Sequence, residues 1–289
     1  ILHLIPGDPA RMLLGDMGGG AAAGDTSDEA YENLREELGL NDPYIVQYGR
    51  YLTDALQGDF GRSFQTNRDV RDSIFEVLPY TLELTVAGLG FAILFGGVLG
   101  IIAALNRNTW IDSLTMVFSL FGLAMPSFWL GFILIQFFAL RWSIFPSTGS
   151  DGWKTLVLPA LTLGLVASGT VARLVRSTML EVLRQEYVTT ARSKGLAERV
   201  VILRHALRNA LIPVVTIVGL QFGGLLSGSV IIETVFARRG LGRLAVEAVL
   251  SRDFPMVQGT ILFAAVGYVF VNLLIDLSYA WLDPRIKYR

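Results

Sequence analysis

The sequence predicts an all-α protein, a polytopic membrane helix bundle with a small extracytoplasmic subdomain. Of its 289 residues, 52% are hydrophobic and only 17% are charged, whereas an ordinary soluble domain has about 25% charged residues. Five long stretches contain no charged side chain, and each is long enough to cross ~30 Å of hydrocarbon as a helix. These observations exclude an ordinary soluble enzyme and a disordered chain.

The residue types that are scarce exclude several kinds of chemistry. The chain has no cysteine, only two histidines and a net charge of -1. A disulfide framework, thiolate catalysis and a thiolate metal site are therefore excluded, and a histidine-rich metal centre is not expected. The balanced charge gives no overall nucleic-acid footprint. We predict no catalytic residue, no metal site and no cofactor in this chain.

The first part of the chain is expected to lie outside the membrane. Ile1–Ile5 is an apolar segment that stops at Pro6, and we interpret residues 1–5 as the end of a truncated first transmembrane helix. Residues 6–79, with 14 acidic and 6 basic side chains, are interpreted as an extracytoplasmic loop subdomain. Apolar spacing predicts short amphipathic helices over 27–38 and 43–56 within it. This subdomain is either a structural lid or a docking surface for an external partner.

The rest of the chain, residues 80–289, is predicted to form the transmembrane domain. Pro126 predicts a kink in the second span. Gly96, Gly97 and Gly100 favour close packing between helices, because small residues allow backbones to approach in lipid. The predicted spans cover about 81–105, 113–140, 156–180, 209–233 and 255–280.

The distribution of Lys and Arg assigns the two faces of the membrane. Residues 106–112, 173–208 and 276–289 hold 12 basic side chains, against 6 in 141–154 and 233–253. The positive-inside rule therefore places the first group, with the C-terminus, in the cytoplasm. Arg173 and Arg176 are expected to extend along the third span to the cytoplasmic interface.

The cytoplasmic loop 181–208 has the most informative pattern. Met179 to Thr190 is expected to continue a helix out of the membrane, and Gly195 permits a turn. A second short helix, Leu196 to Arg208, is expected to have an apolar stripe and a basic side. Such a pair of helices suits anionic lipid, its own bundle or a groove in a soluble partner. The stripe is formed by Leu196, Val200 and Leu203 or Leu207, and the basic side by Arg199, Arg204 and Arg208.

The segment from Tyr187 to Pro213, YVTTARSKGL…RHALRNALIP, resembles the signature loop of a known family. That family is the permease subunits of binding-protein-dependent ABC importers, specifically the dipeptide/oligopeptide/nickel class. The general signature is only partly kept, since Thr189 and Thr190 replace its Glu and first Ala. The resemblance covers essentially the whole chain, and further matches are Pro6-Gly7-Asp8-Pro9, Glu233-Thr234-Val235-Phe236 and Asp283-Pro284-Arg285.

The resemblance implies an ABC type I importer permease in the bacterial or archaeal plasma (inner) membrane. Such a chain translocates di- or oligopeptides, glutathione or nickel chelates. Its expected partners are a second homologous permease subunit, two ATP-binding subunits, an extracytoplasmic solute-binding protein and membrane lipid, but no nucleic acid. ATP and Mg²⁺ would bind the partner subunits, so this chain is not expected to be an enzyme.

Within the resemblance, the loop around Gly195 corresponds to the helix that contacts an ATPase subunit. We expect small Ala191 to allow close seating, and Arg192, Lys194 and Arg199 to pair with acidic side chains of the ATPase. The full set of expected coupling residues is Tyr187, Thr190, Ala191, Arg192, Lys194, Gly195, Leu196 and Arg199.

Polar side chains inside the spans are the candidates for the translocation path. Gln136, Gln221 and Asn272 lie well inside a stretch. Glu83, Glu233 and Asp276 lie near ends, where solvation at the interface is expected to lower the cost of a charge. For each of these six, a hydrogen bond within the bundle is the alternative.

Two other functional classes remain as alternatives. A secondary transporter driven by an ion gradient is disfavoured by the absence of a clear repeat and of mid-span carboxylates. An intramembrane enzyme would need a base beside a nucleophile, and no His or acidic residue lies in the middle of a span to activate the Ser and Thr residues there.

Overall fold

The computed structural model describes residues 31–33, 35–36 and 41–282. The apolar segment 1–5, the Pro6–Pro9 motif and the 283–285 motif lie outside the described residues. Of the helix expected over 27–38, only residues 31–33 and 35–36 are described, and they are helical.

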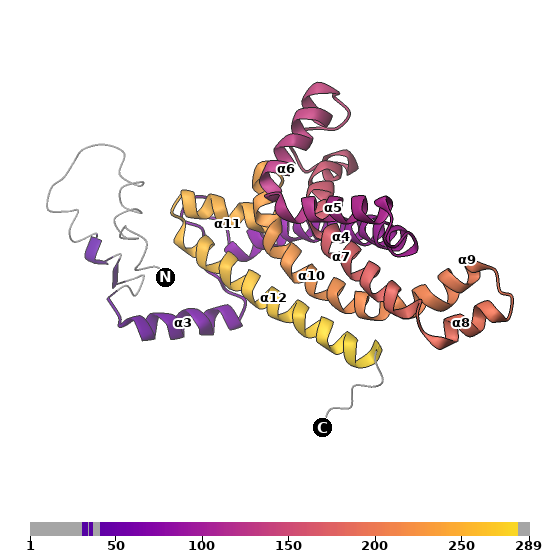
Figure 1. Ribbon diagram of the computed structural model, residues 1–289. Coiled ribbons are helices and arrows are strands. Elements are labelled where there is room, and N and C mark those ends of the chain that lie inside the picture. The colour runs from indigo at the N-terminus through magenta and orange to yellow at the C-terminus, as the bar shows by residue number, and fades with distance from the viewer. Residues whose placement is uncertain (1–30, 34, 37–40, 283–289) are drawn as a thin grey trace. The chain divides into compact units, whose positions relative to one another are not determined.

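The described chain is built from helices, with one isolated antiparallel bridge between Arg62 and Asp69 (Figure 1). The elements are α3 (Tyr44–Leu56), α4 (Val70–Leu105), α5 (Trp110–Ala124), α6 (Ser127–Leu134), the π-helix η2 (Ile135–Arg141), α7 (Trp153–Val182), α8 (Glu186–Ser193), α9 (Glu198–Val200), the π-helix η3 (Val201–Ala206), α10 (Leu207–Val235), α11 (Leu241–Leu250) and α12 (Phe254–Leu282).

Four helical segments of the described chain are long and apolar enough to cross a membrane: 70–105, 153–182, 198–235 and 254–275. A fifth candidate span is broken, because residues 110–122 and 127–141 meet at 102°. The break lies at Pro126, which lacks an N–H and holds Met125 in an extended conformation (ψ 128°). The bend expected at Pro126 is thus a complete interruption of the helix.

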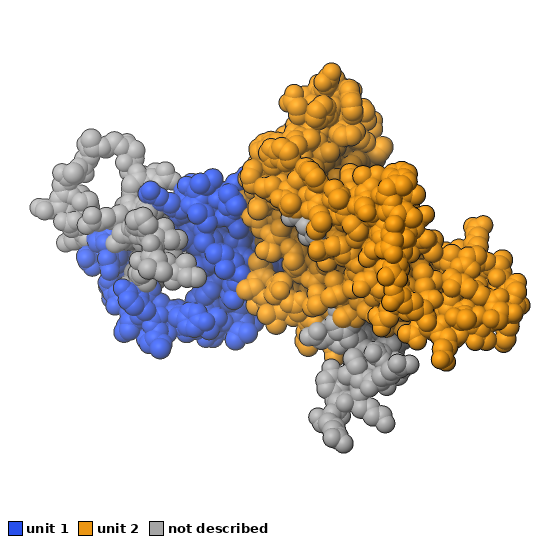
Figure 2. All heavy atoms as spheres, viewed as in Figure 1, with its two compact units in different colours: residues 1–76, 245–263 blue, residues 77–244, 264–289 orange. Residues whose placement is uncertain are grey.

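Two compact units divide the chain (Figure 2). Unit 1 combines residues 1–76 with 245–263, and unit 2 combines 77–244 with 264–289. This division groups residues 245–263 with most of the segment 6–79 that was predicted to be an extracytoplasmic subdomain.

Unit 1 is organised around the Asp253 carboxylate. Asp253 is buried and accepts hydrogen bonds from the Ser63 hydroxyl (2.5 Å) and from the Phe64 N–H (3.2 Å). Its Oδ1 also accepts the Met256 N–H (3.4 Å) in the first turn of α12. One buried carboxylate therefore fixes the turn-rich segment near residue 63 to the start of α12.

Unit 2 has α7 at its centre. In its most apolar window, 61% of α7 is buried, whereas the corresponding windows of the other three unbroken spans are 28% buried or less. Helix α7 packs against α5, α6 and α10. The main core cluster joins Leu84 of α4, Leu158 and Leu163 of α7, and Ile232 of α10.

Two glycines allow α4 to approach α7 closely. A Cβ at Gly96 would lie 2.5 Å from the Ser168 carbonyl oxygen, and one at Gly100 would lie 2.6 Å from that of Ala172. A Cβ at Gly97 would meet nothing within 4 Å. The close packing expected from these glycines is present at Gly96 and Gly100, one helical turn apart, and not at Gly97.

Candidate functional site

The loop 181–208 forms a helical hairpin that projects beyond the ends of α7 and α10 (Figure 1). Helix α7 ends at Val182, and α8 begins at Glu186. The continuous helix expected over Met179–Thr190 is therefore wrong, because the chain turns at 183–185. The second helix was expected to run from Leu196 to Arg208, but α9 and η3 continue directly into α10. The hairpin is thus joined to a long helix of the bundle without a flexible linker.

Gly195 forms the turn of the hairpin. Its φ of +76° lies in the left-handed region, which side chains with a Cβ adopt only with strain. A Cβ there would meet nothing within 4 Å, so backbone conformation and not crowding requires the glycine. The Gly195 N–H donates to the Arg192 carbonyl (2.9 Å), which closes the C-terminus of α8.

The hairpin has its own apolar core. Val188 and Ala191 of α8 pack with Val201 of η3, and Val182 and Leu183 complete the cluster. We expected the small Ala191 side chain to seat an ATPase subunit closely. In the structure Ala191 is buried inside the hairpin, in one cluster with Val188 and Val201.

Two polar interactions connect the two sides of the hairpin. Arg192 donates to Glu198 from Nη2 (2.6 Å) and Nε (3.1 Å), and this pairing raises the pKa of Arg192 further. The Tyr187 hydroxyl accepts a hydrogen bond from Asn209 Nδ2 (2.9 Å). Arg192, expected to meet an acid on another chain, thus already has a carboxylate partner within the hairpin.

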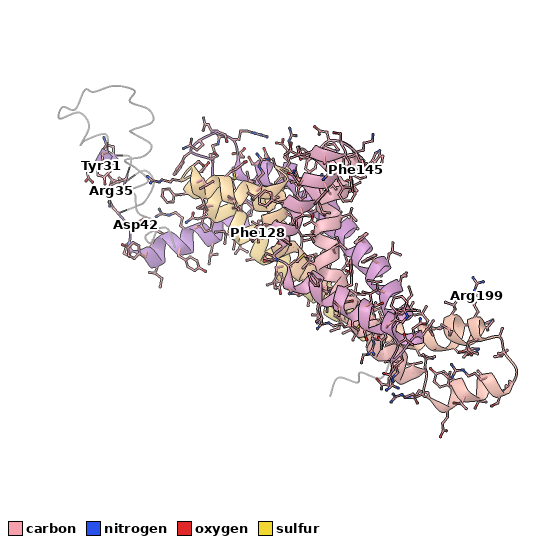
Figure 3. The ribbon with its side chains drawn as sticks, turned by 45° about the horizontal axis from the view of Figure 1, so that its top comes forward. Tyr31, Arg35, Asp42, Phe128, Phe145 and Arg199 are labelled. Carbon is pink, nitrogen blue, oxygen red and sulfur yellow. The ribbon has the colours of Figure 1, made fainter. Side chains whose placement is uncertain are left out.

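The outer surface of the hairpin is apolar and basic. Leu196, Val200 and Leu203 are 41%, 39% and 49% exposed, so most of the expected apolar stripe is not used by the hairpin itself. Lys194 and Arg199 are exposed and make no ion pair with any residue that the structure describes. Figure 3 shows the Arg199 side chain pointing away from the hairpin. Thr190 is exposed as well, and its hydroxyl donates to the Glu186 carbonyl (2.9 Å).

The three polar residues expected along a translocation path lie on three different helices, η2, α10 and α12. Gln136 is exposed on η2. Gln221 is half-buried, and its Nε2 donates to the Ala167 carbonyl of α7 (3.3 Å). Asn272 of α12 lies against Gly223 of α10, where a Cβ would be 3.3 Å from Asn272 Oδ1. Gln221 therefore makes a hydrogen bond within the bundle, which was the expected alternative to a place on the translocation path.

Glu233 is a buried carboxylate, and the solvation expected for it at the interface is wrong. It has no exposed surface. Its Oε1 accepts from the Thr81 hydroxyl (2.7 Å), and its Oε2 accepts from the N–H groups of Gly242 (2.8 Å) and Arg243 (3.1 Å). The N-terminus of α11 thus replaces water as the source of hydrogen-bond donors. The side chain of Asp276 lies outside the described residues.

Arg238 was not identified from the sequence. Its side chain is 1% exposed and donates through Nη2 to Glu83 (2.6 Å), whose side chain is 50% exposed. The guanidinium also lies 5.8 Å from the Tyr80 ring centroid. Nothing in the sequence distinguishes Arg238 from exposed Arg239 beside it, so the ion pair could be found only from the fold.

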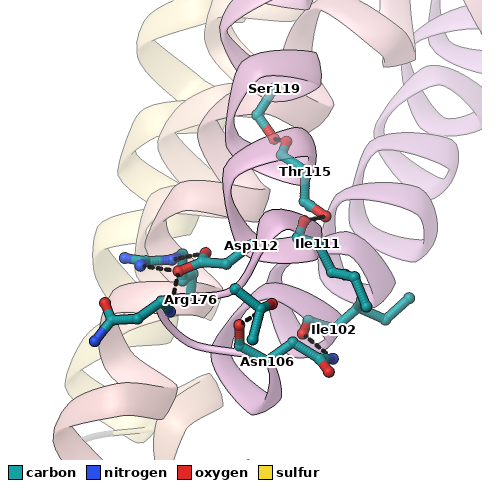
Figure 4. A network of polar contacts seen from close by, with 9 residues as sticks. Ile102, Asn106, Ile111, Asp112, Thr115, Ser119 and Arg176 are labelled. Atoms are coloured by element: carbon teal, nitrogen blue, oxygen red, sulfur yellow. Dashed lines mark hydrogen bonds and ion pairs between the residues drawn. The ribbon is translucent and has the colours of Figure 1, made fainter.

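A second ion pair that the sequence did not reveal joins Asp112 to Arg176 (Figure 4). Arg176 was expected to extend to the interface. Instead, its Nε and Nη2 each donate to the Asp112 carboxylate at 2.6 Å. Asp112 also accepts the Asn108 N–H (3.1 Å). The pair therefore fixes the short turn between α4 and α5 to α7.

Comparison with known proteins agrees with this architecture. Residues 96–288 match the family described as "Binding-protein-dependent transport system inner membrane component". The chain is 42% identical over 288 residues to the "Glutathione transport system permease protein GsiC" of Escherichia coli (strain K12), covering 100% of this chain and 92% of that protein. The GsiC of Salmonella paratyphi A is also 42% identical with the same coverage.

Solved structures show the same fold at lower sequence identity. A chain of the inward-facing MetNI methionine ABC transporter superposes with a TM-score of 0.62 and 17% identity, covering 73% of this chain and 96% of that chain. A chain of an amino acid ABC transporter gives a TM-score of 0.57 and 17% identity, covering 72% and 94%. These likenesses support the fold of the bundle, not a particular solute.

Proposed function

The chain belongs to the family of inner-membrane components of binding-protein-dependent transport systems, and on that premise we propose how it is driven and what it carries. As a member, it is a multi-pass permease subunit of an ABC importer. It works with ATPase subunits and a solute-binding protein, and ATP is hydrolysed by the separate subunits. We infer that it pairs with a second homologous permease and that two ATP-binding subunits serve the pair.

The proposed point of coupling is the hairpin around Gly195. One observation carries this proposal: Leu196, Val200 and Leu203 are exposed on a hairpin that has its own core, next to exposed Lys194 and Arg199, which make no ion pair with the described part of the chain. An amphipathic helix face of this kind fits a groove in a soluble partner. The two cations suit steering and register against acidic side chains.

The hairpin is built to transmit movement. The Arg192–Glu198 pair and the core of Val188, Ala191 and Val201 hold its two sides together. Because α9 and η3 continue into α10 without a break, a push on the hairpin would move a long bundle helix as a rigid body. On α8, Tyr187 and Thr190 would contribute to the contact with the ATPase subunit.

The proposed orientation follows the distribution of basic residues. The hairpin and the C-terminus would face the cytoplasm, and residues 6–79 would lie outside, where the solute-binding protein docks. Exposed apolar side chains of α3, among them Ile45, Tyr48 and Leu56, are the surface that we propose for this docking.

The proposed cargo is a di- or oligopeptide or a related small solute such as glutathione or a nickel chelate. The 42% identity to a protein named as a glutathione permease supports glutathione as the first solute to test. We propose that the cargo passes between this chain and the second permease. The polar side chains that we propose for this path are Gln136, which is exposed, and Gln221 and Asn272, which are half-buried.

Photo-crosslinking in the assembled transporter tests the coupling and the orientation together. A photoreactive residue at Leu203 should link to an ATPase subunit, and one at Leu250 of α11, which is also exposed, should not. Links from Leu250 to the ATPase, with none from Leu203, would reverse the orientation and reject the hairpin as the coupling element.

Uptake into proteoliposomes tests the cargo. Labelled glutathione should accumulate only with ATP, the ATPase subunits and the cognate binding protein. Competition by unlabelled dipeptide or nickel chelate then ranks the solutes. Uptake that persists without the ATPase subunits, driven by an ion gradient, would support a secondary transporter instead.

A further inference from the structure

A polar pocket of about 520 Å³ lies where the turn between α4 and α5 meets the end of α7. Three of the residues that line it are Arg107, Arg176 and Arg184, and one is the acidic Glu181. The Asp112 carboxylate is occupied by Arg176. Neither Arg107 nor Arg184 makes an ion pair within the described ranges, so three guanidiniums face two carboxylates and the pocket keeps one net positive charge.

An apolar groove of about 410 Å³ lies along the same two helices. Leu114, Phe118 and Phe121 of α5 and Leu165 of α7 line it. Leu165 and Arg176 are eleven residues apart, about three turns at 3.6 residues per turn, so they lie on the same face of α7. The groove therefore continues the side of α7 on which Arg176 reaches the polar pocket.

The length of this surface matches one leaflet of a bilayer. From Asp112 to Phe121, α5 rises ~14 Å at ~1.5 Å per residue, and half of the ~30 Å hydrocarbon core is ~15 Å. Trp110 begins α5 at the level of the pocket and is 73% exposed, as is typical of an aromatic anchor at a membrane interface.

We propose that this surface is a binding site for an anionic phospholipid, with the phosphate in the arginine pocket and an acyl chain along the α5–α7 groove. Arg107 and Arg184 would attract the phosphate, and Arg176, held by Asp112, would form the wall of the pocket. The groove accounts for a lipid and not free phosphate, because its lining is almost entirely apolar. The proposed orientation places the site in the cytoplasmic leaflet, where anionic lipids and basic pockets meet.

The test uses the whole transporter in nanodiscs of phosphatidylcholine and phosphatidylglycerol, with bound lipid identified by native mass spectrometry. The unsubstituted complex should retain phosphatidylglycerol in preference to phosphatidylcholine. Arg107→Gln with Arg184→Gln should lower that affinity ~30-fold, or ~2 kcal/mol at about 1 kcal/mol for each basic side chain. Arg173→Gln with Arg204→Gln removes the same charge from the same end of the bundle outside the pocket, and should leave retention unchanged.

A second pair of variants tests the groove without changing charge. Val117→Trp should fill the groove and reduce retention of phosphatidylglycerol, whereas Val98→Trp on α4 should not, although both valines are similarly exposed. Inorganic phosphate should not displace the bound lipid, because it gains nothing from the groove.

Three results would overturn the proposal. They are equal retention of the two lipids by the unsubstituted complex, equal losses in the pocket and control variants, and a photoreactive residue at Val117 that links to the second permease and not to lipid. Since lipid retention is the readout, each of these results leaves the transport function itself untouched.

Discussion

Arg176 and Asp112 form a two-point ion pair between α7 and the first turn of α5, with both hydrogen bonds at 2.6 Å. The Asp112 side chain is 7% exposed and that of Arg176 is 27% exposed. The Asp112 carboxylate also accepts the Asn108 N–H. The ion pair therefore holds the α4–α5 turn, α5 and α7 together at the end of the bundle that carries the hairpin.

Removing the Arg176 guanidinium alone should destabilise the folded protein. Arg176→Met leaves the Asp112 carboxylate buried without its partner, and we expect a loss of about 3 kcal/mol. Thermal unfolding of the detergent-solubilised protein measures it, with Arg173→Met, at an exposed position on the same helix, as the control. Adding Asp112→Asn should recover part of the loss. Additive effects of the two substitutions would contradict a coupled pair.

Two buried threonines on α4 should differ sharply in their contributions. The Thr81 hydroxyl donates to Glu233 (2.7 Å) and accepts the Leu241 N–H (2.8 Å), whereas the Thr85 hydroxyl donates only to the Thr81 carbonyl (2.8 Å). Thr81→Val leaves a buried carboxylate oxygen and a helix N–H without that partner, so we expect a loss of about 2–3 kcal/mol. Thr85→Val should cost less than about 1 kcal/mol. Equal melting temperatures for the two variants would show that the Glu233 network contributes little.

Neighbouring glycines of α4 provide a test of helix packing. Gly100→Ala would bring a Cβ to 2.6 Å from the Ala172 carbonyl oxygen, whereas Gly97→Ala meets open space. We expect Gly100→Ala to destabilise the bundle by about 1–3 kcal/mol through overpacking. Gly97→Ala should be neutral or slightly stabilising, because alanine is the better helix former. Destabilisation by both variants to the same degree would contradict a specific contribution from the α4–α7 contact, because helix propensity favours alanine at both positions.

The sequence was sufficient to predict the membrane bundle, because its signals are local and strong. Long uncharged stretches must be helical in lipid, and Pro126 favours a distortion of its span, although Pro79, Pro159 and Pro213 lie inside unbroken helices. The turn at Gly195 was predictable for the same reason, since glycine suits a left-handed φ. Even the apolar stripe of Leu196, Val200 and Leu203 was visible as a pattern.

What the sequence did not reveal depends on contacts between distant residues. Glu233 was expected to be solvated near a helix end, but the fold brings Thr81 and the start of α11 to it. Arg238 and Arg176 look like the other arginines until their partners Glu83 and Asp112 are placed. The same holds for Ala191, since its buried position follows from how α8 folds back on η3.

The Asp253 carboxylate should control the order of the turn-rich segment in unit 1. Asp253→Asn replaces one acceptor oxygen with an NH₂ group facing the Ser63 hydroxyl or the backbone N–H groups of Phe64 and Met256. We expect a loss of about 1–3 kcal/mol and faster proteolytic cleavage between residues 57 and 66. Asp69→Asn disrupts only an exposed ion pair with Arg62 and should change little. Unchanged cleavage in Asp253→Asn would reject this role.

The hairpin turn offers a test of coupling, because a second glycine outside the hairpin also has a positive φ. Gly195 and Gly152 have φ of +76° and +81°, and neither is crowded within 4 Å. Valine at either position imposes a backbone penalty of at least ~1–2 kcal/mol. Only Gly195→Val distorts the hairpin, so we expect it to reduce ATP-dependent uptake about tenfold, the equivalent of ~1.4 kcal/mol, while Gly152→Val remains within about twofold. Gly195→Asn should keep most activity, since asparagine tolerates the left-handed region. Equal transport by the two valine variants, at equal protein levels, would remove the hairpin from the coupling mechanism.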